Sequence, residues 1–232
     1  MNLNSFLFLE SLSIDKLPVT AIIPFYNPEN IFRKVIEDTL PLVDYLVLVN
    51  DGSTQDVTDY SVNDSKIHIY KLESNSGKGA ALKRGFSEAL ALGSRYILTL
   101  DSDYQHEPKY IPLFLDTLKT SKFVIGKRNI SFRAMPFMRV LSNTITSKVL
   151  SIKTKQKIFD SQSGYRGFDT SIIPLIIPET NGFEAESEMI LRAAKNKIPI
   201  SFIDISTKYD NQKSSIKAFN AIISFIKVII KY

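Results

Sequence analysis

Short apolar runs alternate along the chain with longer stretches whose apolar residues recur every three or four positions. The runs are rich in Val, Ile, Leu and Tyr, a composition typical of β-strands. They cover Val19 to Ile23, Tyr45 to Asn50, Lys66 to Lys71, Tyr96 to Asp101 and Phe123 to Lys127. The stretches between them predict helices at Ile31 to Leu42, Asp56 to Asn63, Gly79 to Leu92 and Tyr110 to Leu118. This alternation predicts an α/β fold whose mostly parallel central sheet is flanked by helices on both faces.

The alternation weakens after residue 128. There the pattern predicts a helix near Pro136 to Ser151, a polar turn at Asp160 to Gly164, a helix at Glu184 to Lys195 and a strand at Ile198 to Ile205. No internal repeat or low-complexity linker divides the chain, and 232 residues suit one large domain with an appended segment. We therefore expect one domain over residues 1–214, followed by a separate segment at 215–232.

The final segment, residues 215–232, has the pattern of an amphipathic helix. Its polar positions are Lys217, Asn220, Ser224, Lys227 and Lys231, and its apolar row is Ile216, Phe219, Ile223, Ile226 and Ile230. Such a helix can lie in a membrane interface beside anionic lipids, or it can dock on its own domain or on a second copy. Its apolar run from Ala221 to Ile230 would span only about 15 Å, which is too short to cross a bilayer.

The composition removes several kinds of catalytic site. The chain has no Cys and only two His, His68 and His106. This excludes disulfides, thiolate nucleophiles and iron–sulfur clusters, and it leaves almost no material for a histidine metal cluster or a Ser-His-Asp triad. We expect chemistry that uses carboxylates, cations and backbone groups. A secretory signal is not expected, because the first basic residue is Lys16 and Glu10 interrupts the early apolar stretch.

Charge is distributed unevenly about a net value of +5. Residues 1–116 carry 10 basic and 16 acidic side chains, and residues 117–232 carry 19 basic and 8 acidic ones. The segment from Thr117 to Phe159 has ten Lys and Arg residues and no Asp or Glu. This basic block can face phosphates, an acidic membrane leaflet or nucleic acid, or it can simply be a solvated surface. We do not expect a nucleic-acid partner, because no nucleic-acid-binding motif accompanies the charge.

Polar clusters follow three of the predicted strands. Asp101 and Asp103 leave the most apolar strand, where two carboxylates can face one divalent cation that also binds a diphosphate. Asp51 follows the second strand and can accept hydrogen bonds from a base or a ribose. Lys78 opens a helix after the third strand, where backbone amides favour an anionic ligand. Taken singly, each cluster also fits an ordinary polar turn.

The ordered motifs together resemble family 2 glycosyltransferases of the GT-A fold. They are I-I-P-F-Y-N (22–27), V-N-D-G-S (49–53), N-S-G-K-G-A-A (75–81), D-S-D-Y-Q-H-E-P (101–108), I-G-K-R (125–128) and D-S-Q-S-G-Y-R (160–166). The resemblance runs from about residue 18 to about residue 215 and is greatest to the branch that makes polyprenyl-phosphate or dolichyl-phosphate sugars. It implies a nucleotide-sugar half at about 18–128 and an acceptor half at about 129–214.

The resemblance also implies an activity and a set of site residues. The activity is inverting, metal-dependent transfer of a hexose from a UDP- or GDP-sugar to a polyprenyl phosphate, at the cytoplasmic, inner face of a membrane. Asp101 and Asp103 match the motif that holds Mg²⁺ or Mn²⁺ and the diphosphate, with Asp103 counted as catalytic. The nucleotide-sugar contacts would be Pro24, Tyr26, Asn27, Asp51, Lys78, Asp101 and Gln105. The acceptor-phosphate contacts would be Arg128, Arg133 and Arg139, since Arg offers a bidentate fork.

Three acidic or basic positions keep more than one interpretation. Asp160, also a candidate catalytic residue, is the base if the acceptor is a sugar hydroxyl, but a phosphate monoester ionises near pH 6 and needs none. Asp160 then orients Arg or metal contacts, or is structural. His106 is a turn residue rather than a general base. Glu186 and Glu188 resemble an acidic segment of relatives, or they form an exposed helix start.

Departures from the family pattern leave rivals open. Asn50 stands where the family often has Asp, and Pro28 stands where an acidic residue is usual. Ser163 occupies a position that is commonly Cys. Many relatives of this branch continue into membrane-spanning helices, whereas here the amphipathic segment serves as a peripheral membrane anchor or the acceptor is not a lipid. The alternatives are a family 2 enzyme with a saccharide acceptor and a module that binds sugar nucleotides or membranes without catalysis. The sequence leaves the oligomeric state open.

Overall fold

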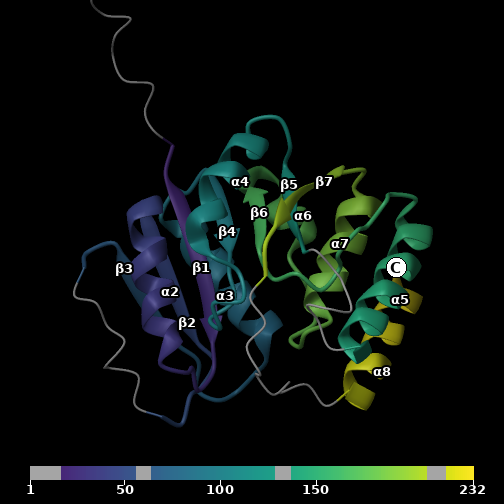
Figure 1. The fold of residues 1–232 in the computed structure, drawn as a ribbon, viewed down its shortest axis with the longest axis horizontal. Coiled ribbons are helices and arrows are strands. Elements are labelled where there is room, and N and C mark those ends of the chain that lie inside the picture. Colours follow the sequence, from purple (N-terminus) through teal and green to yellow (C-terminus); the bar gives the residue numbers. More distant parts are fainter. Residues whose placement is uncertain (1–16, 56–63, 129–136, 208–217) are drawn as a thin grey trace, which may run out of the picture.

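One seven-stranded sheet organises the protein. The computed structural model describes residues 17–55, 64–128, 137–207 and 218–232, and the strand order is β3-β2-β1-β4-β6-β5-β7 (Figure 1). The strands are β1 (Val19–Phe25), β2 (Tyr45–Asn50), β3 (Ile67–Lys71), β4 (Tyr96–Thr99), β5 (Phe123–Arg128), β6 (Arg166–Asp169) and β7 (Ile200–Ile205). β6 runs antiparallel to both of its neighbours, and every other pairing is parallel. The predicted α/β fold with a mostly parallel sheet is confirmed.

The predicted helices are found within a few residues of their expected bounds. The helices are α2 (Ile31–Thr39), α3 (Lys78–Ala91), α4 (Ile111–Leu118), α5 (Phe137–Thr154), α7 (Ala185–Lys195) and α8 (Ala218–Lys231). Two 3-10 turns extend them, η1 (Leu40–Leu42) after α2 and η3 (Pro108–Tyr110) before α4. The helix predicted at Asp56 to Asn63 lies outside the described residues. So does residue 214, where we placed the domain boundary.

The sequence analysis missed strand β6 and the short elements after it, η4 (Thr170–Ile172) and α6 (Ile173–Ile176). β6 has the sequence Arg-Gly-Phe-Asp, which shows neither an apolar run nor alternation, yet all four residues are buried. It is a strand because β4 and β5 supply backbone partners on both of its edges. The predicted polar turn at Asp160 to Gly164 leads directly into it.

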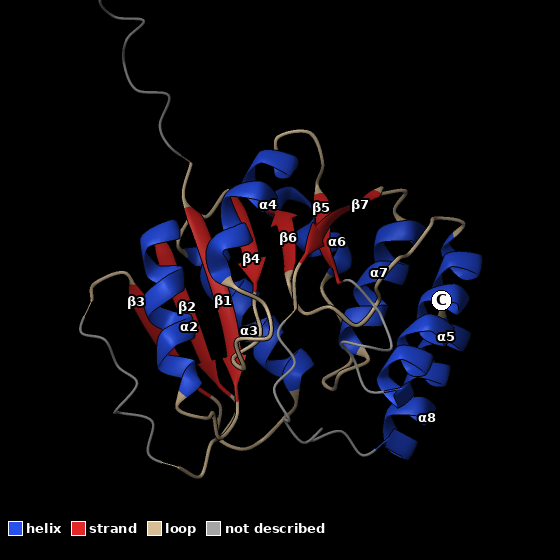
Figure 2. Cartoon of the chain, viewed as in Figure 1, coloured by secondary structure: helices blue, strands red, loops and turns tan. Residues whose placement is uncertain are grey.

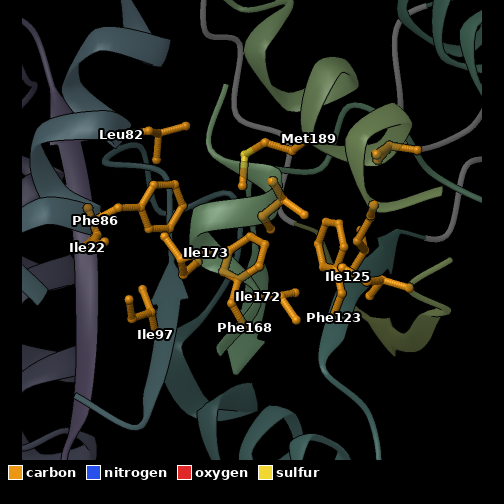
Figure 3. Close-up of a cluster of buried hydrophobic side chains, with 14 of the residues drawn as sticks. Ile22, Leu82, Phe86, Ile97, Phe123, Ile125, Phe168, Ile172, Ile173 and Met189 are labelled. Atoms are coloured by element: carbon orange, nitrogen blue, oxygen red, sulfur yellow. The ribbon is translucent and has the colours of Figure 1, made fainter. Parts of the chain in front are cut away.

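Helices cover both faces of the sheet (Figure 2). On one face α2 and α4 bury Phe32, Ile36 and Phe114 against Ile23 and other strand residues. On the other face α3, α6 and α7 pack on a second cluster, part of which is drawn in Figure 3. There the rings of Phe86 and Phe168 meet edge to face with centroids 5.5 Å apart. Alternate residues of β1 point to opposite clusters, as a doubly covered strand requires.

Helix α8 packs on its own domain through one face. Val228 is buried in the cluster beside α7, and Phe225, Ile229 and Tyr232 pack against it. The row on its other face stays exposed, from 57% at Ile222 through 49% at Ile226 to 77% at Ile230. The sequence left three surfaces open for this helix: a membrane, its own domain or a second copy. The structure shows that it docks on its own domain. Among the described helices, none combines the length and apolarity needed to span a membrane.

Candidate functional site

The predicted polar clusters meet at one edge of the sheet. β1 pairs in parallel with β2 on one side and with β4 on the other. Their carboxyl ends therefore lie next to one another, and the residues that follow them share this edge. Asn27 follows β1, Asp51 follows β2 and Asp101 follows β4. Ligands of open α/β sheets bind beyond the carboxyl ends of the strands, so this edge is the candidate active site.

Asp51 organises the β3–α3 loop, residues 72–77. Its Oδ1 accepts a hydrogen bond from the amide of Ser76 at 2.8 Å, and its Oδ2 accepts one from Gly77 at 2.9 Å. Burial raises the pKa of Asp51, and these two amides partly offset the rise. At the next position a Cβ on Gly52 would lie 2.4 Å from the carbonyl carbon of Ser74. The β2 end and the loop are thus packed backbone to backbone, while the contact of Asp51 with a base stays a prediction.

Asn27 ties the end of β1 to the segment after β2. Its backbone amide donates to Ser53 Oγ at 2.9 Å, and its Oδ1 accepts from the amide of Thr54 at 2.9 Å. Asn27 has a φ of +43°, a region where Asn is tolerated better than most residues. Tyr26 beside it is 44% exposed at the site edge, and Pro24 is buried within β1. The nucleotide contacts predicted for these residues stay predictions.

Lys78 lies between two carboxylates. Its Nζ donates to Asp101 Oδ1 at 2.6 Å and lies 2.9 Å from Glu186 Oε1. Burial lowers the pKa of Lys78, but the charges of Asp101 and Glu186 outweigh it and hold the pKa above its usual value. The side chain is only 16% exposed, so the alternative of a solvated lysine in an ordinary turn is wrong. Lys78 is a fixed positive charge at the start of α3.

The two carboxylates after β4 have pKa values shifted in opposite directions. For Asp101, burial raises the pKa, and the neighbouring charge and hydrogen bond of Lys78 outweigh it to give a lowered value. For Asp103, burial and then the negative charge of Asp101 raise the pKa to about 6. Asp103 Oδ1 also accepts a hydrogen bond from the amide of Gln105 at 3.1 Å. The turn therefore holds one firmly ionised carboxylate beside one that resists ionisation.

These residues fit a divalent cation that completes its shell with ligand and water oxygens. Within the described part of the chain, no group of three or more His, Cys, Asp or Glu side chains is arranged to hold a metal ion. Mg²⁺ sites commonly use only one or two protein carboxylates together with phosphate and water oxygens. A cation would also relieve the repulsion that contributes to the raised pKa of Asp103. Asp101 and Asp103 are the residues that would hold it.

Asp160 and Arg128 form a buried pair. Arg128 Nε and Nη2 donate to the two carboxylate oxygens of Asp160 at 2.6 and 2.9 Å, and Asn143 Nδ2 donates to Oδ1 at 3.0 Å. Burial raises the pKa of Asp160, but the hydrogen bonds and charge of Arg128 outweigh it and give a lowered value. A carboxylate in this state accepts protons poorly, which argues against the general base and fits an orienting or a structural role.

Arg166 and Glu186 at the site, and Glu188 behind it, are residues to which the sequence analysis assigned no established role. Arg166 is buried and donates to the carbonyl oxygens of Ser161, Ser163 and Glu186 at 2.9, 2.9 and 2.7 Å. It therefore joins the loop after Asp160 to the start of α7. Glu186 and Glu188 are 7% and 0% exposed, so the interpretation as an exposed helix start is wrong. The signals in the sequence were the resemblance to an acidic segment of relatives and the alternation of Glu with Ala, Ser and Met.

For the remaining predicted residues within the described part of the chain, the structure gives a position in the fold but does not test their predicted role. Arg133 lies outside the described residues. Arg139 lies in the first turn of α5, four residues before the Asn143 that contacts Asp160. His106 is 4% exposed in the turn before η3, and burial followed by the charge of Arg128 lowers its pKa to about 4. The contacts that Arg133, Arg139 and Gln105 make with substrates stay predictions.

Comparison with known proteins agrees with this geometry. The family model described as Glycosyl transferase family 2 matches residues 20–174. An uncharacterized protein of Methanocaldococcus jannaschii is 30% identical over 226 residues, covering 91% of this chain and 97% of that protein. The UDP-N-acetylglucosamine–dolichyl-phosphate N-acetylglucosaminyltransferase of Methanococcus voltae is 28% identical, covering 91% and 93%. The undecaprenyl-phosphate mannosyltransferase of Micrococcus luteus is 28% identical, covering 80% and 84%.

Solved structures show the same fold. Glucosyl-3-phosphoglycerate synthase of Mycobacterium tuberculosis, in a complex with Mn²⁺, UDP-glucose and phosphoglyceric acid, superposes with a TM-score of 0.73 at 16% identity, covering 92% of this chain and 80% of that one. At this identity the likeness concerns the fold alone, which is the predicted GT-A fold. Because the family model matches well over half of the chain, the protein belongs to glycosyltransferase family 2.

Proposed function

We propose that this glycosyltransferase moves a hexose from a nucleotide diphosphate sugar to a polyprenyl phosphate, with inversion at the anomeric carbon. The observation that carries the proposal is the placement of two cations, Lys78 beside Asp101 and Arg128 beside Asp160, since cations of this kind bind phosphate groups. One end of the proposed site suits a diphosphate and contains Asp101, Asp103 and Lys78. At the other end Arg128 pairs with Asp160. The charge of Arg128 contributes, after burial, Lys78 and His106, to the lowered pKa of Asp101. The two ends therefore belong to one electrostatic site.

The state of Asp160 favours a phosphate acceptor over a hydroxyl acceptor. A sugar hydroxyl must lose its proton during attack, but the carboxylate of Asp160 is fully buried and already accepts from Arg128 and Asn143. A phosphate monoester with a second pKa of about 6 is ionised at neutral pH and attacks without a base. Its oxygen bonds to the anomeric carbon as the bond to the nucleoside diphosphate breaks. In this proposal Asp160 holds Arg128 toward the acceptor phosphate.

Asp101 and Asp103 would hold Mg²⁺ or Mn²⁺ in the proposed reaction. A bound ion of this kind stabilises the negative charge that develops on the leaving diphosphate. The ammonium of Lys78, already beside Asp101, adds a second positive charge near the same group. Solved structures with the same fold contain Mn²⁺ or Mg²⁺ together with UDP, which supports metal use.

The lipid acceptor is supported by relatives and by the surface of the molecule. Two of the relatives are named for dolichyl phosphate and undecaprenyl phosphate acceptors. The exposed Ile222, Ile226 and Ile230 of α8 and the basic block of residues 117–159 suit an apolar interface with anionic headgroups. We propose peripheral contact with the inner, cytoplasmic face of the membrane through these two regions.

A transfer assay tests the proposal. Purified protein is incubated with Mn²⁺ or Mg²⁺, a panel of radiolabelled UDP- and GDP-sugars and either a short polyprenyl phosphate or soluble saccharides. We expect label to enter the organic phase only with the lipid phosphate, and we expect Asp103→Asn to abolish transfer. Transfer to a saccharide alone would establish the rival acceptor. Binding of nucleotide sugar without any transfer would establish a non-catalytic module.

A further inference from the structure

A chain of contacts connects the C-terminal helix to the β3–α3 loop. We infer that Glu188 of α7 and Tyr232 beside α8 are positioning residues for the nucleotide-binding part of the site, an inference that rests on the proposed function. Neither side chain lies at the strand ends where the donor is expected. Their influence passes through the α6–α7 loop, residues 177–184, which packs behind the β3–α3 loop.

Glu188 holds the α6–α7 loop by its backbone. It is fully buried, its Oε1 accepts from the amide of Glu179 at 2.9 Å, and its Oε2 accepts from the amide of Thr180 at 2.9 Å. The hydroxyl of Thr180 adds a third hydrogen bond at 2.7 Å. Hydrogen bonds to an ionised acceptor are stronger than those between neutral groups. Glu188 therefore fixes the position of this loop relative to α7.

Tyr232 adds a further hydrogen bond to the carboxylate of Glu188, from the C-terminal end of α8. Its hydroxyl donates to Glu188 Oε1 at 2.9 Å and accepts from Arg192 Nη1 at 2.8 Å. Arg192 also donates to Glu179 Oε1 at 3.0 Å, and Lys231 pairs with the other oxygen of Glu179. The end of α8 thus contacts both the carboxylate that holds the α6–α7 loop and a side chain of that loop.

The α6–α7 loop in turn is packed tightly against the β3–α3 loop. The amide of Ala80 donates to the carbonyl oxygen of Asn181 at 3.1 Å. A Cβ on Gly77 would lie 2.5 Å from that oxygen, and a Cβ on Gly79 would lie 2.6 Å from the carbonyl oxygen of Thr180. No side chain fits between the two backbones at these points. A shift of the α6–α7 loop must therefore move Gly77 and its neighbours.

The moved residues are the ones that face the donor. Gly77 donates its amide to Asp51, and Lys78 follows it directly and contacts Asp101. Weakening the hold of Tyr232 on Glu188 should loosen this end of the site while leaving Arg128 and Asp160 in place. The expected effect is a loss of nucleotide affinity with little change in the acceptor end.

The test compares Tyr232→Phe with wild type by calorimetric titration of UDP and of GDP in the presence of Mn²⁺. We expect Tyr232→Phe to weaken binding of the preferred nucleotide three- to tenfold. Ile230→Ala is the matched control, because it changes α8 at a side chain that is 77% exposed and outside the contact chain. The control should bind as wild type does. Equal affinity of Tyr232→Phe and wild type would overturn the inference.

The KM values for the donor and for the acceptor, measured with Glu188→Gln, separate a positioning role from a general loss of structure. Glu188→Gln keeps the side-chain shape but cannot accept at both positions, and it should raise the KM for the donor with the KM for polyprenyl phosphate unchanged. Equal changes in both KM values, or none, would contradict the inference. The nucleotide titration also separates this inference from the proposed function. A wild-type protein that binds neither UDP nor GDP would overturn both, whereas normal transfer with unaltered variants would overturn only the inference.

Discussion

Gly164 lies where any side chain would meet the carboxylate of Asp101. A Cβ at this position would be 2.4 Å from Oδ2 and 2.5 Å from Oδ1. We expect Gly164→Ala to displace the Asp101 carboxylate from its place beside Lys78 and to weaken binding of Mn²⁺ and nucleotide at least tenfold. Titration of Mn²⁺ with UDP or GDP, followed calorimetrically, measures the effect.

Gly93→Ala is the control for this substitution. Gly93 has a φ of +72°, so Ala there is strained, but no atom lies within 4 Å of the added Cβ. The control should lose about 1 kcal/mol of stability and keep the affinity for nucleotide. If Gly164→Ala binds as tightly as Gly93→Ala, the contact between Gly164 and Asp101 does not matter for binding.

Asp103 makes the stability of the metal-free protein depend on pH. Its pKa is 3.8 in an ordinary setting and about 6 here, so the folded state binds the proton more tightly than the unfolded state. The stabilisation this gives is present below pH 4 and is lost as pH rises through 6. We expect Asp103→Asn to raise the free energy of unfolding by about 2 kcal/mol at pH 8 and by much less at pH 4.

Thermal denaturation in chelator at the two pH values checks this prediction. A gain of about 2 kcal/mol corresponds to a rise in Tm of roughly 4–8 °C for a domain of this size. Added Mn²⁺ should stabilise the wild type more than Asp103→Asn, because the variant lacks one of the two proposed ligands. A difference in Tm that is the same at pH 4 and pH 8 would contradict the raised pKa.

At the residue scale, the sequence indicated which side chains gather at the sheet edge but not how they are partnered. Asp51, Asp101 and Lys78 were predictable because each lies at or next to the end of a regular element. The partners of Lys78 and Arg128 were not, because Glu186 and Asp160 come from segments much later in the chain. Burial of Arg166 likewise depends on carbonyl groups that only the folded chain brings together.

At the element scale, helix α5 is joined to the site by Asn143. This side chain is fully buried, donates to Asp160 Oδ1 at 3.0 Å and accepts from Ser147 Oγ at 3.2 Å. We expect Asn143→Ala to cost about 1–3 kcal/mol, because it removes a hydrogen bond from a buried carboxylate. Hydrogen exchange of the α5 amides should speed up accordingly, since the helix loses an anchor to the loop before β6.

Thr144→Ala is the neighbouring control for α5. Thr144 is exposed on the same helix, so its replacement tests the helix without touching Asp160. Its effect on stability should stay within about 0.5 kcal/mol. If both variants exchange at the same rate, Asn143 does not anchor the helix.

Strands and helices were predictable where their own residues show an apolar run or a helical spacing of apolar positions. β1 and β2 are continuous apolar runs because both of their faces are covered, and α2 shows helical spacing because one face joins the core cluster under the sheet. Strand β6 carries no such pattern, since its four residues are buried by neighbours that lie far away in sequence. Its position between β4 and β5 could not be deduced from local propensity.

At the scale of the whole molecule, the exposed isoleucines of α8 lead us to predict that the protein binds membranes. We expect the protein to bind vesicles that contain phosphatidylglycerol and to release them as salt is raised, because the attraction to anionic lipid is screened. Replacing Ile222, Ile226 and Ile230 together with Ser should weaken vesicle binding at least tenfold and leave nucleotide affinity unchanged. Co-sedimentation with vesicles measures both effects.

The control for the membrane prediction is Leu113→Ser on α4. Leu113 is also exposed, at 45%, but it belongs to a different helix, which packs on the sheet through the core cluster that contains Phe32 and Phe114. This variant should sediment with vesicles as the wild type does. Unchanged vesicle binding by the triple α8 variant would show that its exposed row is not the membrane contact, and a dimer that the triple variant abolishes would identify a second copy as the partner.

The antiparallel strand in the middle of the sheet has a consequence for synthesis of the chain. When a ribosome has released β1 to β5, the neighbour that joins β4 to β5 has not yet been made, because β6 begins only at Arg166. The edges of β4 and β5 that pair with β6 stay unpaired until about forty more residues emerge, and the other edge of β5 waits for β7. A fragment that ends after β5 would keep those edges open, so the sheet reaches its final strand order only when β6 and β7 have been added.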